Sequence, residues 1–199
     1  MRRQDMRQHL IATGLRVLHG QGFNGCGVQE ITDAAQVPKG SFYNHFDSKE
    51  QFGAEVLGRY WEERLTRAQG VLSDETRPPL ERLRAYFDAK TGIEAPRAAA
   101  PSKSFARGCM IGNFAAELAG QSRLVRDRLD LVYAGWTRLL AACIRDAQRD
   151  GSLQGDDDPE TLAAFLIDAF EGAVLRSKVD QDATALHRFH RIVFTRLLV

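Results

Sequence analysis

Apolar side chains recur at three- and four-residue spacing through almost the whole chain, which is the pattern of amphipathic helices. The segment 5–20, for example, places Leu10, Ile11 and Leu18 on one face. No stretch shows the alternation of apolar and polar residues that a half-buried strand requires. The sequence therefore predicts an all-α protein.

The composition limits the partners that the chain can have. Its 199 residues carry a net charge of +1, so binding to a polyanion must come from a local patch. No apolar run reaches the length of a membrane span, and the start, MRRQDMRQHL, lacks the apolar segment of a signal peptide. The three widely spaced cysteines, an odd number, argue against a disulfide framework. We therefore expect a cytoplasmic protein with no membrane partner.

The segment VPKGSFYNHF, residues 37–46, combines features that neither a core helix nor a loop needs. On a helix over 39–46, Phe42 and Phe46 stand four residues apart on one face, and Gly40 and Asn44 lie opposite. The segment therefore predicts a short helix that buries its aromatic face and uses its polar face for binding.

A tight turn joins this helix to a second short helix over 28–35, which is the arrangement of a helix-turn-helix unit that enters the major groove of DNA. A helix N-terminus favours phosphate, glycine permits close backbone approach, and polar side chains supply charge and hydrogen bonds. The alternative is a small three-helix subdomain whose exposed side chains are only solvated. The candidate DNA contacts are Gln29, Lys39, Gly40, Ser41, Tyr43, Asn44, His45 and Lys49.

The segment GFNGCGVQEITDAAQVPKGSFYNHFDSKEQF, residues 22–52, resembles the signature of the TetR family of bacterial repressors. The resemblance implies a helix-turn-helix DNA-binding domain over 1–50 and a helical domain over 51–199 that binds an inducer and forms a homodimer. It also implies a palindromic duplex operator as partner. The chain departs from the family at Gly27 and Pro38, where Ser or Thr is frequent, so backbone N–H groups must replace side-chain contacts there.

Within this family, the motifs HLIATG, GFNGCGV, VPKGSFYNHFDSKEQFG and GCMIGN resemble the NemR- and AcuR-like branch. That branch senses reactive electrophiles or small unsaturated acids. The resemblance implies that Cys109 is the sensing thiol and that Lys178 lies beside it. By its own pattern Lys178 is a solvated lysine near a helix end.

The residues around Cys109 leave two interpretations open. Cys109 follows Arg107 and Gly108 at an expected helix start, where a nearby cation and the helix dipole favour the reactive thiolate. The alternative is a small buried hydrophobe, which is the commoner role of an isolated cysteine.

The last two long segments, LAAFLIDAFEGAVL and FHRIVFTRLLV, are too apolar for one subunit's core to cover. They predict a homodimer whose interface is a four-helix bundle. His187 and His190 lie three residues apart, but with no acidic or cysteine partner nearby in sequence we expect a dimer-surface role for them rather than a metal site.

The chain contains no cofactor motif, no metal-ligand cluster and no base with an orienting partner. The acidic run at 156–158 reads as the start of a helix. We therefore expect no cofactor, no metal and no enzymatic activity. The alternative from another class is a thiol enzyme that consumes electrophiles through Cys109. Within the repressor hypothesis, the alternative is a small organic inducer that binds without a covalent bond.

Overall fold

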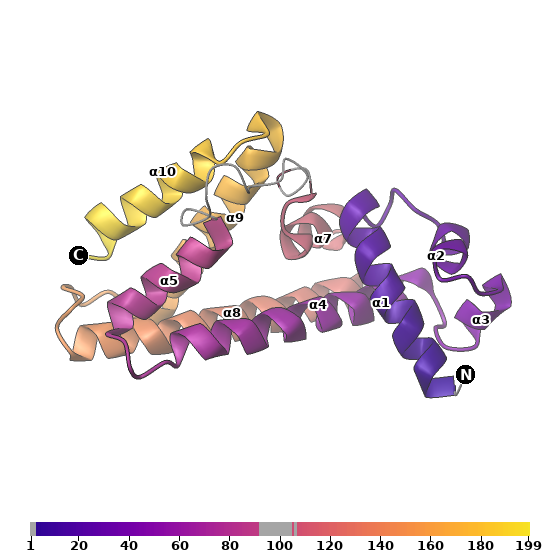
Figure 1. Cartoon of the computed structure of the whole chain (residues 1–199), viewed down its shortest axis with the longest axis horizontal. Helices are drawn as coiled ribbons and strands as arrows, with labels where there is room; N and C mark the ends of the chain where they lie inside the picture. Colours follow the sequence, from indigo (N-terminus) through magenta and orange to yellow (C-terminus); the bar gives the residue numbers. More distant parts are fainter. Residues whose placement is uncertain (1–2, 92–104, 106) are drawn as a thin grey trace. The chain divides into compact units, whose positions relative to one another are not determined.

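The computed structural model describes residues 3–91, 105 and 107–199, and the regular structure in these ranges is helical (Figure 1). The all-α prediction is therefore confirmed. None of the helices in these ranges has an apolar stretch long enough to cross a membrane. The helices are α1 (Arg3–Gln21), α2 (Val28–Ala34), α3 (Lys39–Tyr43), α4 (Lys49–Leu72), α5 (Pro79–Thr91), α7 (Met110–Leu118), α8 (Arg123–Arg149), α9 (Pro159–Asp180), α10 (Thr184–Ile192) and a final π-helical turn (Val193–Leu197).

Contacts between Cα atoms divide the chain into two compact units. Unit 1 comprises Met1–Glu63 and Met110–Val132, and unit 2 comprises Arg64–Cys109 and Tyr133–Val199. The packing units differ from the expected ranges 1–50 and 51–199 because α7 and the beginning of α8 fold onto the N-terminal helices. The expected ranges describe a division of function, and they stay a prediction.

Unit 1 is built around an aromatic cluster. The ring centroids of Phe42, Phe46 and Phe52 lie 4.9–5.3 Å apart, and all three side chains are buried. A Cβ atom at Gly14 of α1 would lie 2.2 Å from Cζ of Phe52 on α4. The two helices can therefore approach this closely only because residue 14 is glycine, and the expected burial of the aromatic face of α3 is confirmed.

Helix α7 joins unit 1 through contacts over long sequence separations. The ring of Phe114 on α7 lies edge-on to Phe23, with centroids 5.9 Å apart. The backbone N–H of Asn24 donates to Oε2 of Glu117 at 2.8 Å. These contacts fix the turn after α1, which leads into the helix-turn-helix.

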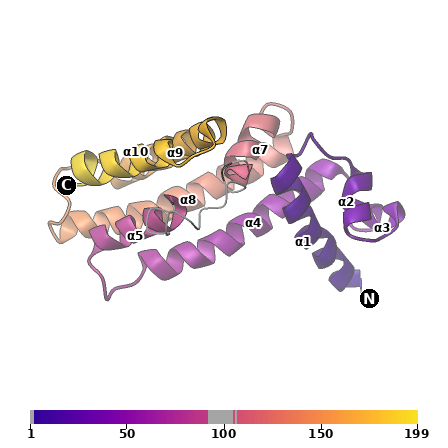
Figure 2. The same ribbon diagram turned by 45° about the horizontal axis from the view of Figure 1, so that its top comes forward.

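The core of unit 2 is centred on Phe87 of α5. Its ring centroid lies 5.2 Å from Phe189 of α10 and 5.9 Å from Phe170 of α9. Helices α9 and α10 run antiparallel and lie side by side (Figure 2). The aromatic side chains of these helices interdigitate and fill the core of unit 2, as is usual in close-packed protein interiors.

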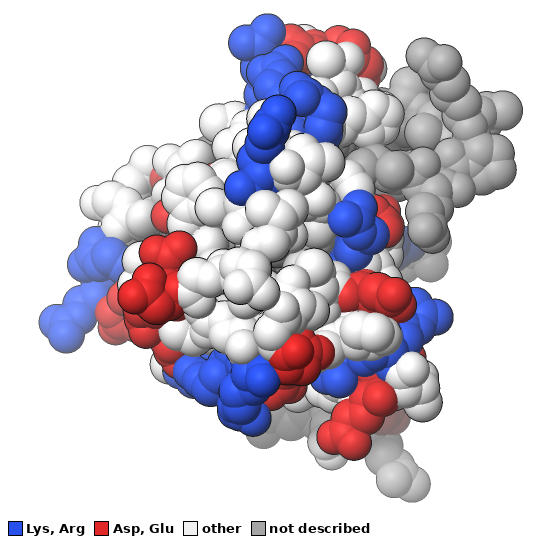
Figure 3. Space-filling model, turned by 90° about the vertical axis from the view of Figure 1, so that its left-hand side faces the viewer, with Lys and Arg blue, Asp and Glu red and all other residues white. Residues whose placement is uncertain are grey.

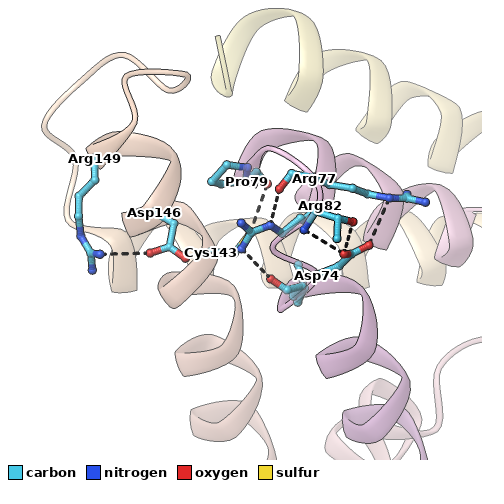
Figure 4. Close-up of polar contacts among 9 residues, drawn as sticks. Asp74, Arg77, Pro79, Arg82, Cys143, Asp146 and Arg149 are labelled. Atoms are coloured by element: carbon cyan, nitrogen blue, oxygen red, sulfur yellow. Dashed lines mark hydrogen bonds and ion pairs between the residues drawn. The ribbon is translucent and has the colours of Figure 1, made fainter.

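The connection between α4 and α5 is held by the nearly buried side chain of Arg82 (Figure 4). Its Nε donates to the carbonyl of Arg77 at 2.8 Å and its Nη1 to the carbonyl of Leu72 at 3.4 Å. The same guanidinium lies 3.7 Å from Oδ2 of Asp146 on α8. Arg82 therefore satisfies the carbonyl of Leu72 at the end of α4 and that of Arg77 in the connection.

Side chains cap two helix starts, one of them at the acidic run where the sequence predicts the start of a helix. Oδ2 of Asp158 accepts a hydrogen bond from the N–H of Thr161 at 2.9 Å, and Oγ of Ser48 accepts one from the N–H of Gln51 at 3.1 Å. Helix α3 ends at Tyr43, earlier than the expected range of 39–46.

The surface on the left of Figure 1 faces the viewer in Figure 3. Lysine and arginine side chains there lie in small groups among aspartate and glutamate, around a large uncharged area. Mixed charge of this kind produces no strong field of one sign. This face is therefore unsuited to a polyanion.

Replacing Gly14 by Ala should lower the free energy of unfolding by about 1–3 kcal/mol, because the added methyl group must displace the ring of Phe52. Urea denaturation followed by circular dichroism measures the change. Gly20→Ala is the matched control in the same helix, because a Cβ at Gly20 meets nothing within 4 Å. Equal losses in the two variants would contradict the packing argument.

Candidate functional site

The turn between α2 and α3 has the geometry that a helix-turn-helix requires. Gln36 adopts the left-handed conformation with φ of 56°, and the N–H of Val37 donates to the carbonyl of Thr32 at 3.0 Å. Glu30 accepts a hydrogen bond from the N–H of Gly27 at 2.8 Å, so the glycine start of α2 is capped by a side chain from its own first turn. Hydrogen bonds from its own backbone N–H and from that of Gly27 lower the pKa of Glu30.

Most of the candidate DNA contacts share the outer side of α2 and α3. Tyr43 is 54% exposed although its ring edge meets Phe42, so its hydroxyl can reach a partner. Gly40 has open space around its α-carbon, and Gln29 is held by a hydrogen bond from Nε2 to Oδ1 of Asp33 at 2.7 Å. The exposed residues are Gln29, Lys39, Gly40, Tyr43 and Asn44, and the half-buried ones are Ser41, His45 and Lys49.

Lys49 differs from the other candidates because its ammonium group has an internal partner. Nζ donates to the carbonyl of Phe23 at 2.6 Å and lies 4.2 Å from the centroid of the Phe23 ring. A cation at this place, just past the end of α1, is stabilised by the helix dipole and by the ring face. Lys49 therefore ties α4 to α1, a contact that sequence position alone did not indicate.

In unit 2, Lys178 of α9 lies against the residue that precedes Cys109. Cδ of Lys178 would be 2.7 Å from a Cβ atom at Gly108, whose φ is +63°. Glycine is needed here both for its backbone conformation and for the space that the lysine stem occupies. Cys109 itself is half-buried and directly precedes α7.

The other two cysteines are buried. Sγ of Cys143 donates to the carbonyl of Pro79 at 3.3 Å, and burial raises the pKa of this thiol to about 11. Burial also raises the pKa of Cys26, which is 4% exposed. A raised thiol pKa disfavours the reactive thiolate of Cys26 and Cys143. Because those two are buried and Cys109 is half-buried, Cys109 is the accessible cysteine of the three.

A second group of side chains, missed by the sequence reasoning, surrounds Lys90 of α5. Nζ of Lys90 lies 4.9 Å from the ring centroid of Tyr86, 5.2 Å from that of Trp136 and 5.8 Å from that of Phe170. From the sequence, Tyr86 and Trp136 could line a pocket, but aromatic side chains on amphipathic helices are core by default. The signal that was available is the position of Lys90, four residues after Tyr86 on the same face of α5.

Burial dominates the acid–base behaviour of this Lys90 cluster. It lowers the pKa of Lys90 to about 8, while the charges of Cys109 and Glu171 oppose the shift and that of Arg64 adds to it. Burial also raises the pKa values of Tyr86 and Tyr133, so both phenols stay protonated. The cluster thus presents neutral hydroxyl donors beside an amine that is easily deprotonated.

An apolar groove runs between α9 and α10. Phe165 is 55% exposed and Ile192 45% exposed, so large apolar side chains face outward along it. Ala169 and Gly172 line the groove, whereas Ala163 is buried on the inner side of α9. The groove residues are Phe165, Ala169, Gly172, Ala173, Arg176, Ala185, Arg188, Phe189, Ile192, Val193 and Leu197.

His190 lies beside this groove, but its ring turns inward. Its Nε2 is 2.6 Å from Oδ1 of Asp88 on α5. His187 is exposed. Within the described ranges there is no group of three or more His, Cys, Asp or Glu side chains that could hold a metal ion.

Two family models match the chain. One is described as "Bacterial regulatory proteins, tetR family" and matches residues 10–56, and the other as "Tetracyclin repressor-like, C-terminal domain" and matches residues 79–193. The first covers the helix-turn-helix, and the second covers the Lys90 cluster and all of the groove residues except Leu197.

Several characterised proteins are similar over nearly the whole length. The HTH-type transcriptional repressor DhaR of Mycobacterium sp. (strain GP1) is 40% identical over 198 residues, which is 100% of this chain and 95% of DhaR. The transcriptional regulator AcuR of Cereibacter sphaeroides is 36% identical over 92% of this chain and 81% of AcuR. The HTH-type transcriptional repressor NemR of Escherichia coli K12 is 29% identical over 89% of this chain and 86% of NemR.

Solved structures show the same fold. A regulatory protein TetR from Rhodobacter sphaeroides superposes with a TM-score of 0.83 at 35% identity and covers 96% of this chain and 98% of that one. The reduced form of E. coli NemR superposes with a TM-score of 0.83 at 28% identity and covers 95% of each chain.

Proposed function

The chain is a TetR-family transcriptional repressor, and we propose that it binds a palindromic operator as a homodimer and leaves it when its sensing unit meets a reactive electrophile, an oxidant or a small organic inducer. The observation that carries the sensing part is the contact of Lys178 with Gly108, directly before the accessible Cys109. The similar proteins DhaR and AcuR are transcriptional regulators, which favours the repressor over the thiol-enzyme alternative.

DNA binding is assigned to the outer side of α2 and α3. The aromatic cluster fixes the inner side, so Tyr43 and Lys39 point away from the core of unit 1. Contacts from these side chains to phosphates would position the unit on the duplex. In the dimer, we expect the two α3 helices to lie about 34–36 Å apart, or a multiple of that distance, to meet successive major grooves.

The groove between α9 and α10 is proposed as the dimer interface. Its exposed Phe165 and Ile192 would be covered by the same two helices of a second copy, which gives a four-helix bundle. A twofold interface of this kind is self-complementary. The small residues Ala169 and Gly172 allow the helices to approach closely.

The switch begins at Cys109. Hypochlorous acid would oxidise its thiolate to sulfenic acid and release chloride, and condensation with the amine of Lys178 would form a sulfur–nitrogen bond and release water. An alkylating electrophile would form a thioether at the same sulfur. A redox response of this chain is supported by its similarity to E. coli NemR, one solved structure of which is described as the reduced form.

The effect on DNA would pass through α4, which begins in unit 1 and ends in unit 2. A change in the separation of the two recognition helices would prevent both half-sites from being bound at once. Most of the bivalent gain in affinity would then be lost.

Tyr43→Ala and Lys39→Ala should each weaken operator binding by roughly 1 kcal/mol or more without lowering thermal stability, and Lys39→Ala should also reduce the salt slope by about one unit. Fluorescence anisotropy on a duplex selected by the wild-type protein measures both effects. Lys49→Ala is the contrasting variant, because loss of its bond to Phe23 should lower thermal stability. Unchanged affinity in the folded Tyr43→Ala, Lys39→Ala double variant would refute the assignment.

Cys109→Ser should bind the operator like the wild type and fail to release it after treatment with N-ethylmaleimide, because the reacting sulfur is gone. Lys178→Ala should keep the alkylation and lose the oxidant-driven link, which intact mass spectrometry detects. Cys26→Ser is the control, since that thiol is buried. A wild-type response in Cys109→Ser would show that the inducer binds without a covalent bond.

Phe165→Asp should convert the dimer to a monomer at micromolar concentration and reduce operator affinity at least tenfold, because a buried unpaired carboxylate destabilises the interface. Analytical ultracentrifugation measures the mass. Leu131→Asp is the matched control, an exposed apolar residue (64%) on α8 that does not line the groove. A wild-type protein that sediments as a monomer would rule out the proposed interface.

A further inference from the structure

Lys90 occupies an environment that no other described lysine shares. It is half-buried on α5, and its ammonium lies within 5.8 Å of three aromatic ring centroids, those of Tyr86, Trp136 and Phe170. Lys39 is exposed, and Lys49 bonds to a backbone carbonyl. Aromatic faces stabilise an ammonium but cannot accept its protons as water does, so the desolvated cation remains costly.

Charged groups from three directions act on this amine. Arg64 of α4 repels the ammonium, whereas Glu171 of α9 and Cys109 attract it. The balance leaves the pKa of Lys90 at about 8, below its ordinary value of 10.5. At pH 7 about a tenth of such amines are neutral, against roughly one in three thousand for an ordinary lysine.

A lysine that is desolvated in an apolar site beside another cation is the type of nucleophile that attacks carbonyl groups. We propose that Lys90 is a second reactive group of the sensing unit, an amine that captures small aldehydes or ketones as an imine among Tyr86, Trp136 and Phe170. The amine nitrogen forms a bond to the carbonyl carbon, and the carbonyl oxygen leaves as water with the two amine protons. No oxidant or cofactor is needed.

The surrounding residues suit this reaction. The phenols of Tyr86 and Tyr133 stay protonated because burial raises their pKa values, so they can donate hydrogen bonds to a carbonyl oxygen. The apolar ring faces limit access of water, which otherwise hydrolyses an imine. The charge of Cys109 acts on the amine of Lys90. Unit 2 therefore contains two nucleophiles that interact, the soft thiol of Cys109 and the harder amine of Lys90.

The consequence for repression rests on the proposed function, whereas the imine itself does not. An adduct on α5 adds volume among packed rings, so it would shift unit 2 away from its DNA-binding arrangement. Carbonyl compounds without an alkylating group would then act as inducers independently of Cys109.

The full-length protein allows a direct test because the chain has only five lysines, at positions 39, 49, 90, 103 and 178. Propanal is the probe, since it has no conjugated double bond or leaving group and cannot alkylate Cys109. Sodium cyanoborohydride traps imines as stable secondary amines, and peptide mapping assigns each one. Lys90 should be modified at least tenfold faster than Lys39 at pH 7, and Lys90→Arg should lose the fast modification while keeping the wild-type circular dichroism spectrum.

The pH profile separates a reactive amine from a merely exposed one. With free Nα-acetyl-lysine as an internal standard, the rate of Lys90 relative to the standard should be constant below pH 8 and fall above it, as Lys90 becomes fully neutral while the standard continues to deprotonate. A ratio that stays constant to pH 10, or modification of Lys90 no faster than of Lys39, overturns the proposal.

Operator release distinguishes this proposal from the proposed function. Propanal with the reductant should release DNA from the Cys109→Ser protein and not from the Lys90→Arg protein. If Lys90 is modified and both proteins stay bound, the proposed second sensing role is wrong. If Lys90 is not modified while N-ethylmaleimide still releases the wild type, only the amine chemistry fails and the repressor function stands.

Discussion

The ring of Phe52 occupies the space that any side chain at residue 14 would fill, and unit 1 depends on this contact. It sets the distance between α1 and α4, and the aromatic cluster of Phe42, Phe46 and Phe52 packs into the space that remains. Because Phe42 and Phe46 are held on the inner side, Tyr43 is left outside. The aromatic cluster that packs beside this glycine therefore holds one side of α3 inside and leaves the side of Tyr43 open to a partner.

Sequence patterns predicted what depends on neighbours along the chain. The helices, the Asp158 cap and the buried aromatic face of α3 all follow from spacings of a few residues. Contacts between residues that are far apart in the sequence could not be predicted from such spacings. Lys49 was expected to face DNA, yet it reaches Phe23, 26 residues earlier. Likewise, the aromatics around Lys90 read as ordinary core until three helices bring them together.

Gly108 does in unit 2 what Gly14 does in unit 1. In both places a missing Cβ admits a side chain from another helix, Lys178 in one case and Phe52 in the other. The difference is that Phe52 is rigid and apolar, whereas Lys178 is a long chain with a polar end. The first contact fixes a structure, and the second places the lysine stem against the residue that precedes Cys109. The resemblance implied this neighbourhood, but the spacing of 109 and 178 could not.

In both units, most of the described lysine side chains make contacts within the fold. Of the four lysines that the structure describes, Lys39 alone is exposed, while Lys49, Lys90 and Lys178 are half-buried against backbone, rings or a glycine. Because the ammonium of Lys49 is bonded within unit 1, it would contribute less electrostatic attraction to DNA phosphates at each half-site. In the proposed dimer, affinity would then depend more strongly on binding two half-sites at once. Dependence on both half-sites would also allow a small change in unit 2 to end repression, so the internal use of cations and the sensitivity of the proposed switch would have the same physical origin.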